Sequence, residues 1–419
     1  MPTTTPADRV ASAPVGASDD LDGIAGTVLR LGVVGAGGFA LFVDQAIRTL
    51  PQLHVVAVTD RDPARARDFA AAHGARVHAS TDDLLADPEV DAVLVATPPA
   101  QHAELSLAAL AAGKHIFCEK PAALDPEQAA QVTQQVQATS LGYVVDHVIH
   151  YNPLVQLLHR LQRQGVLGQV QRFSFDNDAG DSELPPGHWF WDPRVSGGIL
   201  LEHGVHFFDV ARLLLGRREL EVQTRTRQRD DGRVDTVVST VVHEGGALAT
   251  HCHGFSHANP TERQLMRIDF GLAEARLEGW IPLELRLDAW LDEPGLELLR
   301  AELEREDCLT LPGFRANPHQ AVQLQLDDTP AQQLRTLDQD HPDRRRVRLV
   351  ARLGRPQDKL AIYQESVRAA LTDFLAASAG ARPLAGIAEG AAAVAVAHAA
   401  TLAADGSVQP VTPASVPLA

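Results

Sequence analysis

The stretch LGVVGAGGFA, residues 31–40, joins a β-rich run to an amphipathic stretch through a turn with three glycines. In the dinucleotide-binding fingerprint, the first glycine permits a tight turn and the second lets the backbone approach a pyrophosphate. Gly35 and Gly37 hold these two places, and Ala40 holds the third, where the fingerprint tolerates alanine. The free N–H groups of the following helix would bind the phosphates. The predicted dinucleotide site includes Gly35, Gly37, Gly38 and Phe39.

Adenosine recognition is predicted at Asp60, which ends the next β-rich run, residues 54–60. A carboxylate in this place accepts hydrogen bonds from the ribose hydroxyls, and its charge repels a 2′-phosphate. Asp60 therefore favours NAD over NADP. Its neighbour Arg61 is a second candidate, because it can stack on adenine or bind a 2′-phosphate; the alternative is a solvated residue at a helix start.

β-rich runs and amphipathic stretches alternate from residue 29 to residue 150. This alternation predicts βαβ units, and hence a doubly wound parallel sheet of the Rossmann type. Runs of strands dominate residues 151–419, which predicts an α+β domain with a large, mostly antiparallel open sheet for substrate binding and oligomerisation. Its expected parts are strands at 219–227, 234–243, 247–255, 264–270 and 273–279, an elaborated insertion over 292–350, and closing helices near 356–379 and 387–404.

Composition argues against several classes of function. The 419 residues carry a formal net charge of −17, so we expect no binding to nucleic acid or to anionic membranes. Three scattered cysteines fit neither a disulfide framework nor a CxxC zinc module. Residues 1–28 lack the pattern of a secretory signal and are predicted to be a disordered tail, with a contact to a second subunit as the alternative. We therefore expect a soluble, cytoplasmic protein.

Two further groups of motifs carry a resemblance to a known family. The first is ATPP (96–99) with His102, followed by AGKHIFCEKP (112–121); the second is SGG (196–198) followed by EHGVHFFD (202–209). Over residues 31–216 the sequence resembles the Gfo/Idh/MocA oxidoreductases, which include glucose–fructose oxidoreductase and inositol dehydrogenase. The resemblance implies hydride transfer between a nicotinamide cofactor and a carbon of a sugar or polyol. It adds these residues to the expected cofactor site: Thr97, Pro98, His102, Glu119 and Lys120.

The resemblance also implies that Lys120, His206 and Glu202 carry the catalysis, and that the bond before Pro121 is cis. Lys120 follows a predicted strand, where open α/β sheets bind ligands, and an ammonium there would stabilise a developing alkoxide. An imidazole titrates near neutral pH, so His206 would exchange the hydroxyl proton. Helical spacing places Glu202 and Asp209 on the face of His206. We expect Asp209 to orient His206, and Glu202 to reach either the substrate or His206.

Two positions depart from the family pattern. Glu202 stands where the family usually has aspartate, and His150 where it usually has arginine, so a neutral histidine weakens the case for an anionic substrate group. Trp189 and Trp191 stand together in a loop, where they can pack on a sugar ring or form a hydrophobic plug or subunit contact. The predicted substrate-binding residues are His150, Trp189, Trp191, Glu202 and Asp209.

Two further groups of residues are predicted to form no functional site. A metal would draw on His203, His206, His251, His253 and Glu202. These residues lack the HExxH order of zinc proteases, and the mechanism that the resemblance implies is free of metal, so no metal is predicted. Residues 344–346 are three arginines after several aspartates, which predicts a solvated, salt-bridged turn.

The sequence as a whole predicts an NAD-dependent dehydrogenase of a sugar, cyclic polyol or glycoside. One alternative keeps the cofactor but uses it transiently, to cleave a glycoside. The other is a cofactor-sensing regulator without activity, against which the presence of Lys120 and His206 argues. An open sheet face needs cover, so we expect a homodimer or homotetramer joined through the second sheet.

Overall fold

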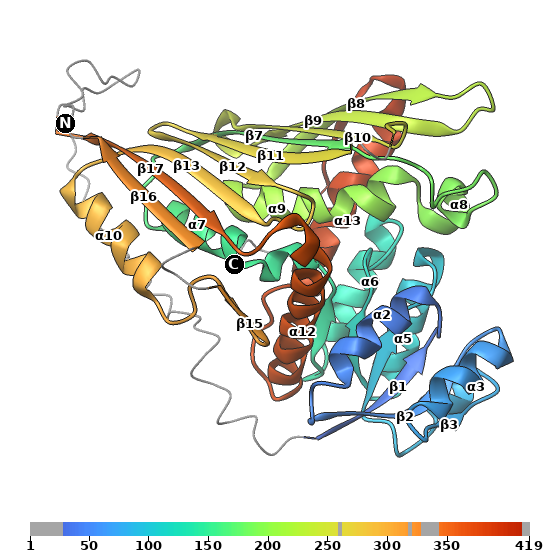
Figure 1. The fold of residues 1–419 in the computed structure, drawn as a ribbon. Coiled ribbons are helices and arrows are strands. Elements are labelled where there is room, and N and C mark those ends of the chain that lie inside the picture. Colours follow the sequence, from blue (N-terminus) through green and yellow to red (C-terminus); the bar gives the residue numbers. More distant parts are fainter. Residues whose placement is uncertain (1–27, 259–261, 317–320, 328–342, 413–419) are drawn as a thin grey trace, which may run out of the picture.

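The structure is a computed structural model, and it describes residues 28–258, 262–316, 321–327 and 343–412. Two sheets organise these residues, one built from the first third of the chain and one from the remainder (Figure 1). The predicted tail, residues 1–28, lies outside the described residues except for Val28.

Six parallel strands form the first sheet, in the order β3-β2-β1-β4-β5-β6. They are β1 (Leu29–Val34), β2 (Leu53–Thr59), β3 (Arg76–Val77), β4 (Ala92–Val95), β5 (His115–Cys118) and β6 (Tyr143–Val145). Their helices are α2 (Gly38–Ile47), α3 (Pro63–Ala71), α4 (Thr81–Leu85), α5 (His102–Ala111) and α6 (Pro126–Gln137). The order reverses between β1 and β4, and open sheets bind ligands beyond the carboxyl ends of the strands at such a point. The predicted doubly wound fold is confirmed.

Helix starts in this sheet differ in one respect that concerns the site. Side chains cap α3, α4 and α6, where Asp62, Ser80 and Asp125 accept hydrogen bonds from first-turn N–H groups. The N-cap of α2 is Gly37, and no side chain bonds there. Its N–H groups therefore stay available to an anion, as the fingerprint predicts.

Ten strands form the second sheet, in the order β16-β17-β13-β12-β11-β7-β10-β9-β8-β18. Neighbours are antiparallel except β7 and β10, which confirms the mostly antiparallel sheet. The strands are β7 (Val170–Asp178), β8 (Glu219–Gln228), β9 (Val234–His243), β10 (Leu248–Gly254), β11 (Arg263–Phe270), β12 (Ala273–Glu278), β13 (Glu284–Leu291), β16 (Val322–Asp327), β17 (Arg345–Arg352) and β18 (Val408–Pro410).

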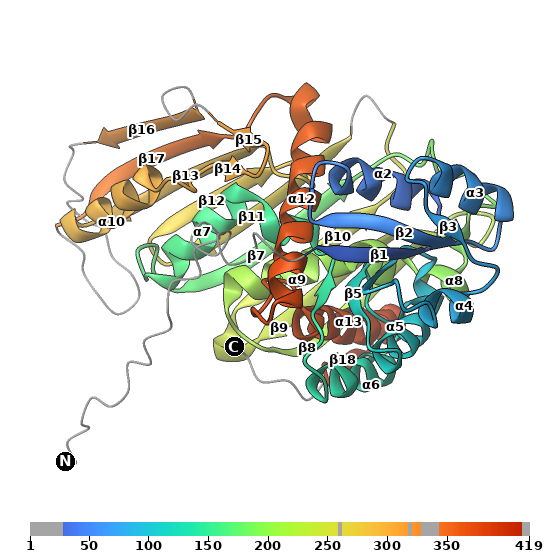
Figure 2. The same cartoon turned by 90° about the horizontal axis from the view of Figure 1, so that it is seen from below.

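Helices pack on one face of this sheet and tie it to the first (Figures 1 and 2). The principal ones are α7 (Pro153–Arg163), α9 (Val205–Leu215), α10 (Glu293–Glu304), α12 (Lys359–Ser378) and α13 (Ile387–Leu402). Helix α12 packs against α2 and β6, and α13 packs against both α6 and α9. The two closing helices therefore fix the relative position of the two sheets.

The segment 292–350, predicted as an elaborated insertion, contains α10 and also β16 and the first part of β17, which extend the large sheet beyond β13. The turn predicted at residues 344–346 is wrong, because β17 begins at Arg345. Val347, Leu349 and Ala351 alternate along that strand and are buried, which is the pattern of a half-buried strand. The outward arginines pair across strands, as Arg346 does with Asp288 at 2.6 Å.

Within the described residues, one helical segment, Ile387–Asp405, is long and apolar enough to cross a membrane. Most of it is buried inside the protein, which is also typical of the core helix of a soluble protein.

Candidate active site

The glycine-rich turn leaves space where the fingerprint predicts a pyrophosphate. Gly35 has φ +93°, and a Cβ there would lie 2.7 Å from the Ala96 carbonyl oxygen, so only glycine fits. A Cβ on Gly37 or Gly38 would meet no atom within 4 Å, which means that both face open space. Phe39 is half-buried in the first turn of α2, with its ring 5.9 Å from that of Phe42.

Asp60 lies beside this turn. One carboxylate oxygen accepts a hydrogen bond from the Ala36 N–H at 2.7 Å, and the other accepts one from the Asp62 N–H at 2.7 Å. The half-buried carboxylate therefore joins the ends of β1 and β2, at the place where a ribose would meet it. Arg61 is exposed next to it.

Lys120 lies at the end of β5, before a Lys120–Pro121 bond that is cis, as the resemblance implies. Its Nζ donates to Glu202 Oε1 at 2.7 Å and to the Glu202 carbonyl oxygen at 2.5 Å. Burial lowers the pKa of Lys120, but the carboxylates of Glu202 and Glu119 raise it by more, so the net pKa is above its usual value. The side chain is therefore an ammonium with two of its three N–H groups engaged.

A π-helical turn, Leu200–Gly204, precedes α9 and sets the direction of Glu202. Sequence spacing leaves Glu202 free to reach the substrate or His206, but its carboxylate bonds to Lys120. A π turn holds one more residue between its hydrogen-bonded groups than an α turn, so Glu202 and His206 no longer follow regular helical spacing. Such turns occur frequently at functional sites.

His206 is buried at the start of α9, and no described residue hydrogen-bonds to its ring; its Nδ1 is fully enclosed. The ring of His147 lies 6.1 Å away and that of Trp280 lies 6.4 Å away, between centroids. Burial lowers the pKa of His206 well below its usual range, and the charge of Lys120 lowers it further. His206 is therefore a neutral imidazole, the form that a proton acceptor needs.

Asp209 does not orient His206, and this prediction is wrong. Its Oδ2 lies 2.8 Å from Nδ1 of His150, and both side chains are buried. Burial lowers the pKa of His150, but the Asp209 carboxylate raises it by more, so the net pKa is above its usual value. The neutral His150 expected from the sequence is therefore replaced by a buried ion pair with Asp209.

His102 and Thr97 lie behind the cofactor edge. Both ring nitrogens of the buried His102 are 2.7 Å from carbonyl oxygens, those of Thr97 and Pro121. His102 thus holds the end of β4 to the Lys–Pro turn. Thr97 Oγ1 is buried with no partner among the described residues, and Pro98 is exposed beside it.

Glu119 lies at the end of β5 and is 7% exposed, and Asp146 follows β6 and is 1% exposed. Their carboxyl groups hydrogen-bond to each other. Burial and the charge of Asp146 raise the pKa of Glu119 well above its usual range, and burial raises the pKa of Asp146 to about 7. Sequence reasoning identified Glu119 but not Asp146.

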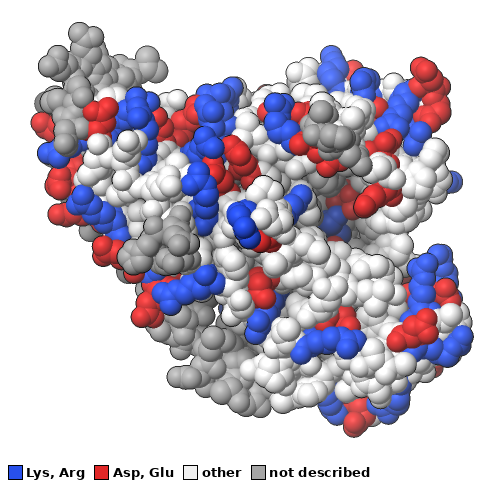
Figure 3. Space-filling model, in the orientation of Figure 1, with Lys and Arg blue, Asp and Glu red and all other residues white. Residues whose placement is uncertain are grey.

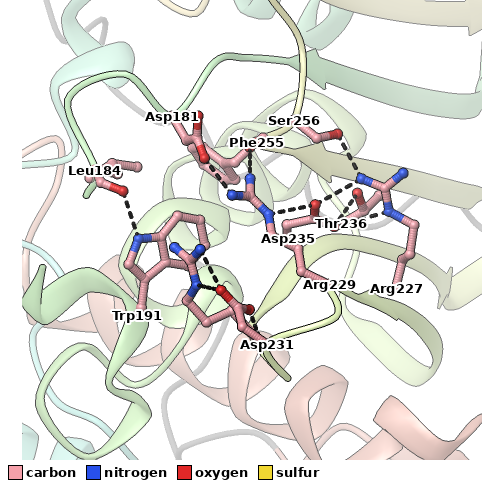
Figure 4. Close-up of polar contacts among 11 residues, drawn as sticks. Asp181, Leu184, Trp191, Arg227, Arg229, Asp231, Asp235, Thr236, Phe255 and Ser256 are labelled. Atoms are coloured by element: carbon pink, nitrogen blue, oxygen red, sulfur yellow. Dashed lines mark hydrogen bonds and ion pairs between the residues drawn. The ribbon is translucent and has the colours of Figure 1, made fainter. Parts of the chain in front are cut away.

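Of the two predicted tryptophans, Trp189 is 40% exposed, whereas Trp191 is held inside its own loop. The Trp191 indole N–H donates to the Leu184 carbonyl at 2.9 Å, and the guanidinium of Arg229 lies 5.4 Å from its ring centroid. Figure 4 shows Arg229 between Asp181 and Asp235, which tie this loop to the tip of the β8–β9 hairpin. Trp191 therefore has a structural position, and Trp189 is the one that a ligand can reach.

The buried histidines of the second sheet form no metal site in the described part of the chain. His203 Nδ1 and His253 Nδ1 lie 3.0 Å apart, which satisfies one donor and one acceptor. His251 packs against the ring of Phe208 at 4.5 Å.

Trp280 lies beside His206 and has no signal in the sequence. It stands in the β12–β13 turn, 4.8 Å from the ring of Tyr363 of α12, and Lys359 Nζ lies 5.5 Å above its ring. All three are half-buried, and tertiary packing alone brings Trp280 next to His206. In Figure 3 a hollow that contains charges of both signs separates the region of α8 from that of α2 and α3.

Comparison with known proteins bears on this arrangement. Residues 29–147 match the family model described as "Oxidoreductase family, NAD-binding Rossmann fold", and residues 155–270 match the GFO/IDH/MocA C-terminal domain. The chain belongs to the GFO/IDH/MocA oxidoreductase family. The resemblance stated from its motifs is confirmed, and its first domain is an NAD-binding Rossmann domain.

Individual relatives differ in the substrates that their names give. The chain is 32% identical to inositol 2-dehydrogenase of Rhizobium meliloti over 194 residues, 46% of this chain and 57% of that protein. It is 30% identical to dTDP-3,4-didehydro-2,6-dideoxy-alpha-D-glucose 3-reductase of Streptomyces antibioticus over 290 residues, 68% of this chain and 82% of that protein. Levoglucosan dehydrogenase in complex with NADH and L-sorbose shares the fold, with a TM-score of 0.72 at 19% identity over 92% of this chain and 100% of that one. Several relatives are matched over only 52–64% of their length.

Proposed function

We propose that the protein is an NAD-dependent dehydrogenase that oxidises a hydroxyl-bearing carbon of a sugar, cyclic polyol or glycoside, or reduces the matching carbonyl. The observation that carries this proposal is the pairing of a lysine ammonium with a neutral, unpartnered histidine at the carboxyl edge of an NAD-binding sheet. When bound there, the nicotinamide supplies the hydride acceptor or donor.

The protein's own residues stabilise the reacting oxygen and transfer its proton. The third N–H of Lys120 is free to hydrogen-bond the reacting oxygen and to stabilise the charge that develops on it. His206, as a neutral imidazole, takes the hydroxyl proton during oxidation and returns it during reduction. Glu202 keeps Lys120 charged and holds its ammonium in place, which makes it a positioning residue.

The charges around Lys120 favour an uncharged substrate. Glu202, Glu119 and Asp146 supply three buried or half-buried carboxyl groups next to one ammonium. A substrate carboxylate or phosphate would add repulsion at this point. The name of the inositol 2-dehydrogenase relative gives such a neutral polyol, whereas the dTDP-sugar in the name of the 3-reductase carries its charge on a diphosphate outside the sugar ring.

A screen of cyclic polyols, free sugars and glycosides with NAD tests the proposal. We expect at least one neutral compound to yield NADH in proportion to the substrate consumed, as read by absorbance, with its uronate or phosphate analogue turned over more slowly. Release of a reducing sugar without net NADH would instead support transient oxidation and glycoside cleavage. Binding of NAD without turnover of any compound would support the alternative that the protein is a cofactor-sensing regulator without activity.

We also propose that the protein is a cytoplasmic homodimer or homotetramer joined through the outer face of the large sheet. On β9 and β10 that face carries uncharged side chains, among them Val238 and Leu248, which are 44% and 41% exposed, whereas Arg225 and Arg227 of the neighbouring β8 are exposed on the same face. Towards β13 and β17 the same face carries cross-strand ion pairs such as Arg352–Glu284. An uncharged patch beside complementary charges suits a second copy of the same face.

A further inference from the structure

The carboxyl groups of Glu119 and Asp146 meet because their strands are neighbours. Strands β5 and β6 run parallel with Cys118 opposite Val145, and the Asp146 N–H donates to the Cys118 carbonyl at 2.9 Å. The next residue of each strand therefore leaves the sheet at the same edge. Both side chains are buried, and Asp146 Oδ1 has no partner in the hydrogen bonds of the described residues.

The two carboxyl groups share a single proton. Two buried carboxylates in contact repel each other, and the pair therefore holds a proton that one isolated carboxyl would lose. Among the described residues, Lys120 is the cation that acts on both, and it already donates twice to Glu202. The pair therefore gains its one negative charge as the pH rises through about 7, the pKa of Asp146.

Several other titratable groups lie near the Glu119–Asp146 pair. Glu202 acts on it from the π-helical turn, and Tyr363 faces it from α12. Cys118, Tyr151 and Tyr363 have pKa values raised by burial, so they stay neutral, and burial lowers the pKa of His147. His150, paired with Asp209, is the one nearby histidine whose pKa is raised.

The fold places this pair on the nicotinamide side of the cofactor site. The glycine turn follows β1 and Asp60 follows β2, so these residues would hold the adenosine half at the ends of β1 and β2. Residues that follow β4, β5 and β6, on the other side of the switch point, would then hold the nicotinamide half. Glu119, Lys120 and Asp146 follow the last two of these strands.

We propose that the Glu119–Asp146 pair takes up the proton that oxidation of the substrate releases, and that its protonation is linked to the redox state of the bound cofactor. The proposal rests on the proposed function. Oxidation of CH–OH gives C=O, moves a hydride to the ring and releases the hydroxyl proton. The positive ring of NAD⁺ favours the ionised pair, and the neutral ring of NADH removes that attraction, so the pair regains a proton.

Thermodynamic linkage between proton binding and nucleotide binding determines how the affinity for NAD⁺ and NADH changes with pH. Because binding of NAD⁺ favours the ionised pair, it releases protons and becomes tighter as the pH rises through about 7, the pKa of Asp146. The neutral ring of NADH exerts no such attraction, so NADH binding should exchange few protons and change little over the same range. The ratio Kd(NADH)/Kd(NAD⁺) should therefore rise with pH, by at most about tenfold per pH unit for one proton.

Isothermal titration calorimetry of the full chain with NAD⁺ and with NADH measures this directly. At pH 7, titrations in two buffers of different ionisation enthalpy give the number of protons exchanged, and a series from pH 6 to 8.5 gives the ratio of Kd values. We expect proton release with NAD⁺, little exchange with NADH, and a ratio that rises at least about fivefold over the series. Asp146→Asn and Glu119→Gln should each remove most of the difference, because either leaves only one carboxyl.

Asp373→Asn is the matched control. Asp373 is a half-buried carboxyl that also has a raised pKa, and its Oδ2 accepts from Tyr151 at 2.7 Å and Leu384 N–H at 2.8 Å, which asparagine can reproduce. This variant should exchange protons as the parent does. Equal proton numbers for NAD⁺ and NADH in the parent would overturn the proposal. A difference in proton number that survives in both Asp146→Asn and Glu119→Gln would also overturn it, because the proton exchange would then be assigned to His150.

The experiment needs no substrate, so it separates this proposal from the proposed function. A protein that shows the linkage but oxidises none of the compounds screened would retain the inference and lose the dehydrogenase assignment. A protein that binds neither nucleotide would lose both.

Discussion

Replacing Lys120 by alanine removes the ammonium that contacts Glu202 and that, in the proposed mechanism, would bond the reacting oxygen. Two of its three N–H groups donate to Glu202, at 2.7 and 2.5 Å, so a single N–H is available to a substrate oxygen. Loss of one preorganised, charged donor to a developing oxyanion costs about 3 kcal/mol or more, which is a fall in kcat of about 100-fold. Binding of NAD should not change, because the lysine acts on the substrate.

Lys114→Ala is the matched control for this variant. Lys114 is a buried lysine that directly precedes β5, at the edge of the sheet opposite to Lys120, which follows the strand. Its Nζ donates to the carbonyl oxygens of Val90 and Asp87, at 2.7 and 3.1 Å. Lys114→Ala should lower Tm, because it leaves buried carbonyls unpaired, and should keep the kcat of the parent.

Steady-state kinetics with the compound identified by the screen, together with Tm and the Kd of NAD, tests the role of Lys120. A Lys120→Ala enzyme within about threefold of the parent in kcat, less than about 1 kcal/mol, would refute the role of this lysine. Equal losses of kcat in Lys114→Ala and Lys120→Ala would show that removal of any buried lysine is sufficient.

Other variants test the remaining residues. His206→Asn should lower kcat by about two orders of magnitude with NAD binding intact, and activity within threefold of the parent would contradict its role as proton acceptor. Glu202→Gln removes a carboxylate that raises the pKa of Lys120, so the alkaline limb of the kcat/KM profile should move to lower pH; an unchanged limb would separate Glu202 from Lys120 in function. Asp60→Ser should shift nucleotide preference from NAD towards NADP, and tighter binding of NADP than NAD by the parent would overturn the role of Asp60. Val238→Arg with Leu248→Arg should reduce the mass measured by light scattering, and a parent that is monomeric at micromolar concentration would rule out the proposed interface.

The parts of the site that the sequence predicted are those set by local backbone chemistry. Gly35 needs a positive φ, and Asp60 and Lys120 each follow a buried strand, so a motif of a few residues determines where these groups lie. Asp209 was assigned wrongly because its partner His150 lies in another element, and helical spacing contains no information about that contact.

Two other differences have identifiable physical causes. The π-helical turn at Leu200–Gly204 changes the register between Glu202 and His206, and nothing in the composition of that turn signals it. In β17, residues 345–352, the period-two pattern of a strand is present, but neighbouring arginines and aspartates resemble a solvated turn unless the partner strand β13 is known. Trp280 and Tyr363 were not identified because they lie outside every motif and reach the site only through tertiary packing.

His206 and the Glu119–Asp146 pair differ in proton affinity, and this difference gives each of them a separate part in the proposed mechanism. His206 is neutral and close to the substrate, but its lowered pKa means that it binds a proton weakly and cannot hold it at neutral pH. Asp146 has a pKa of about 7, so the Glu119–Asp146 pair binds the same proton more strongly. In the proposed mechanism the ionised pair carries one negative charge, which the positive ring of NAD⁺ would balance before oxidation. After hydride transfer that charge would lose its partner, and the proton taken by His206 would move to the Glu119–Asp146 pair. The same ordering runs in reverse during reduction, when NAD⁺ forms and the pair releases its proton, so one set of residues serves both directions of the reaction.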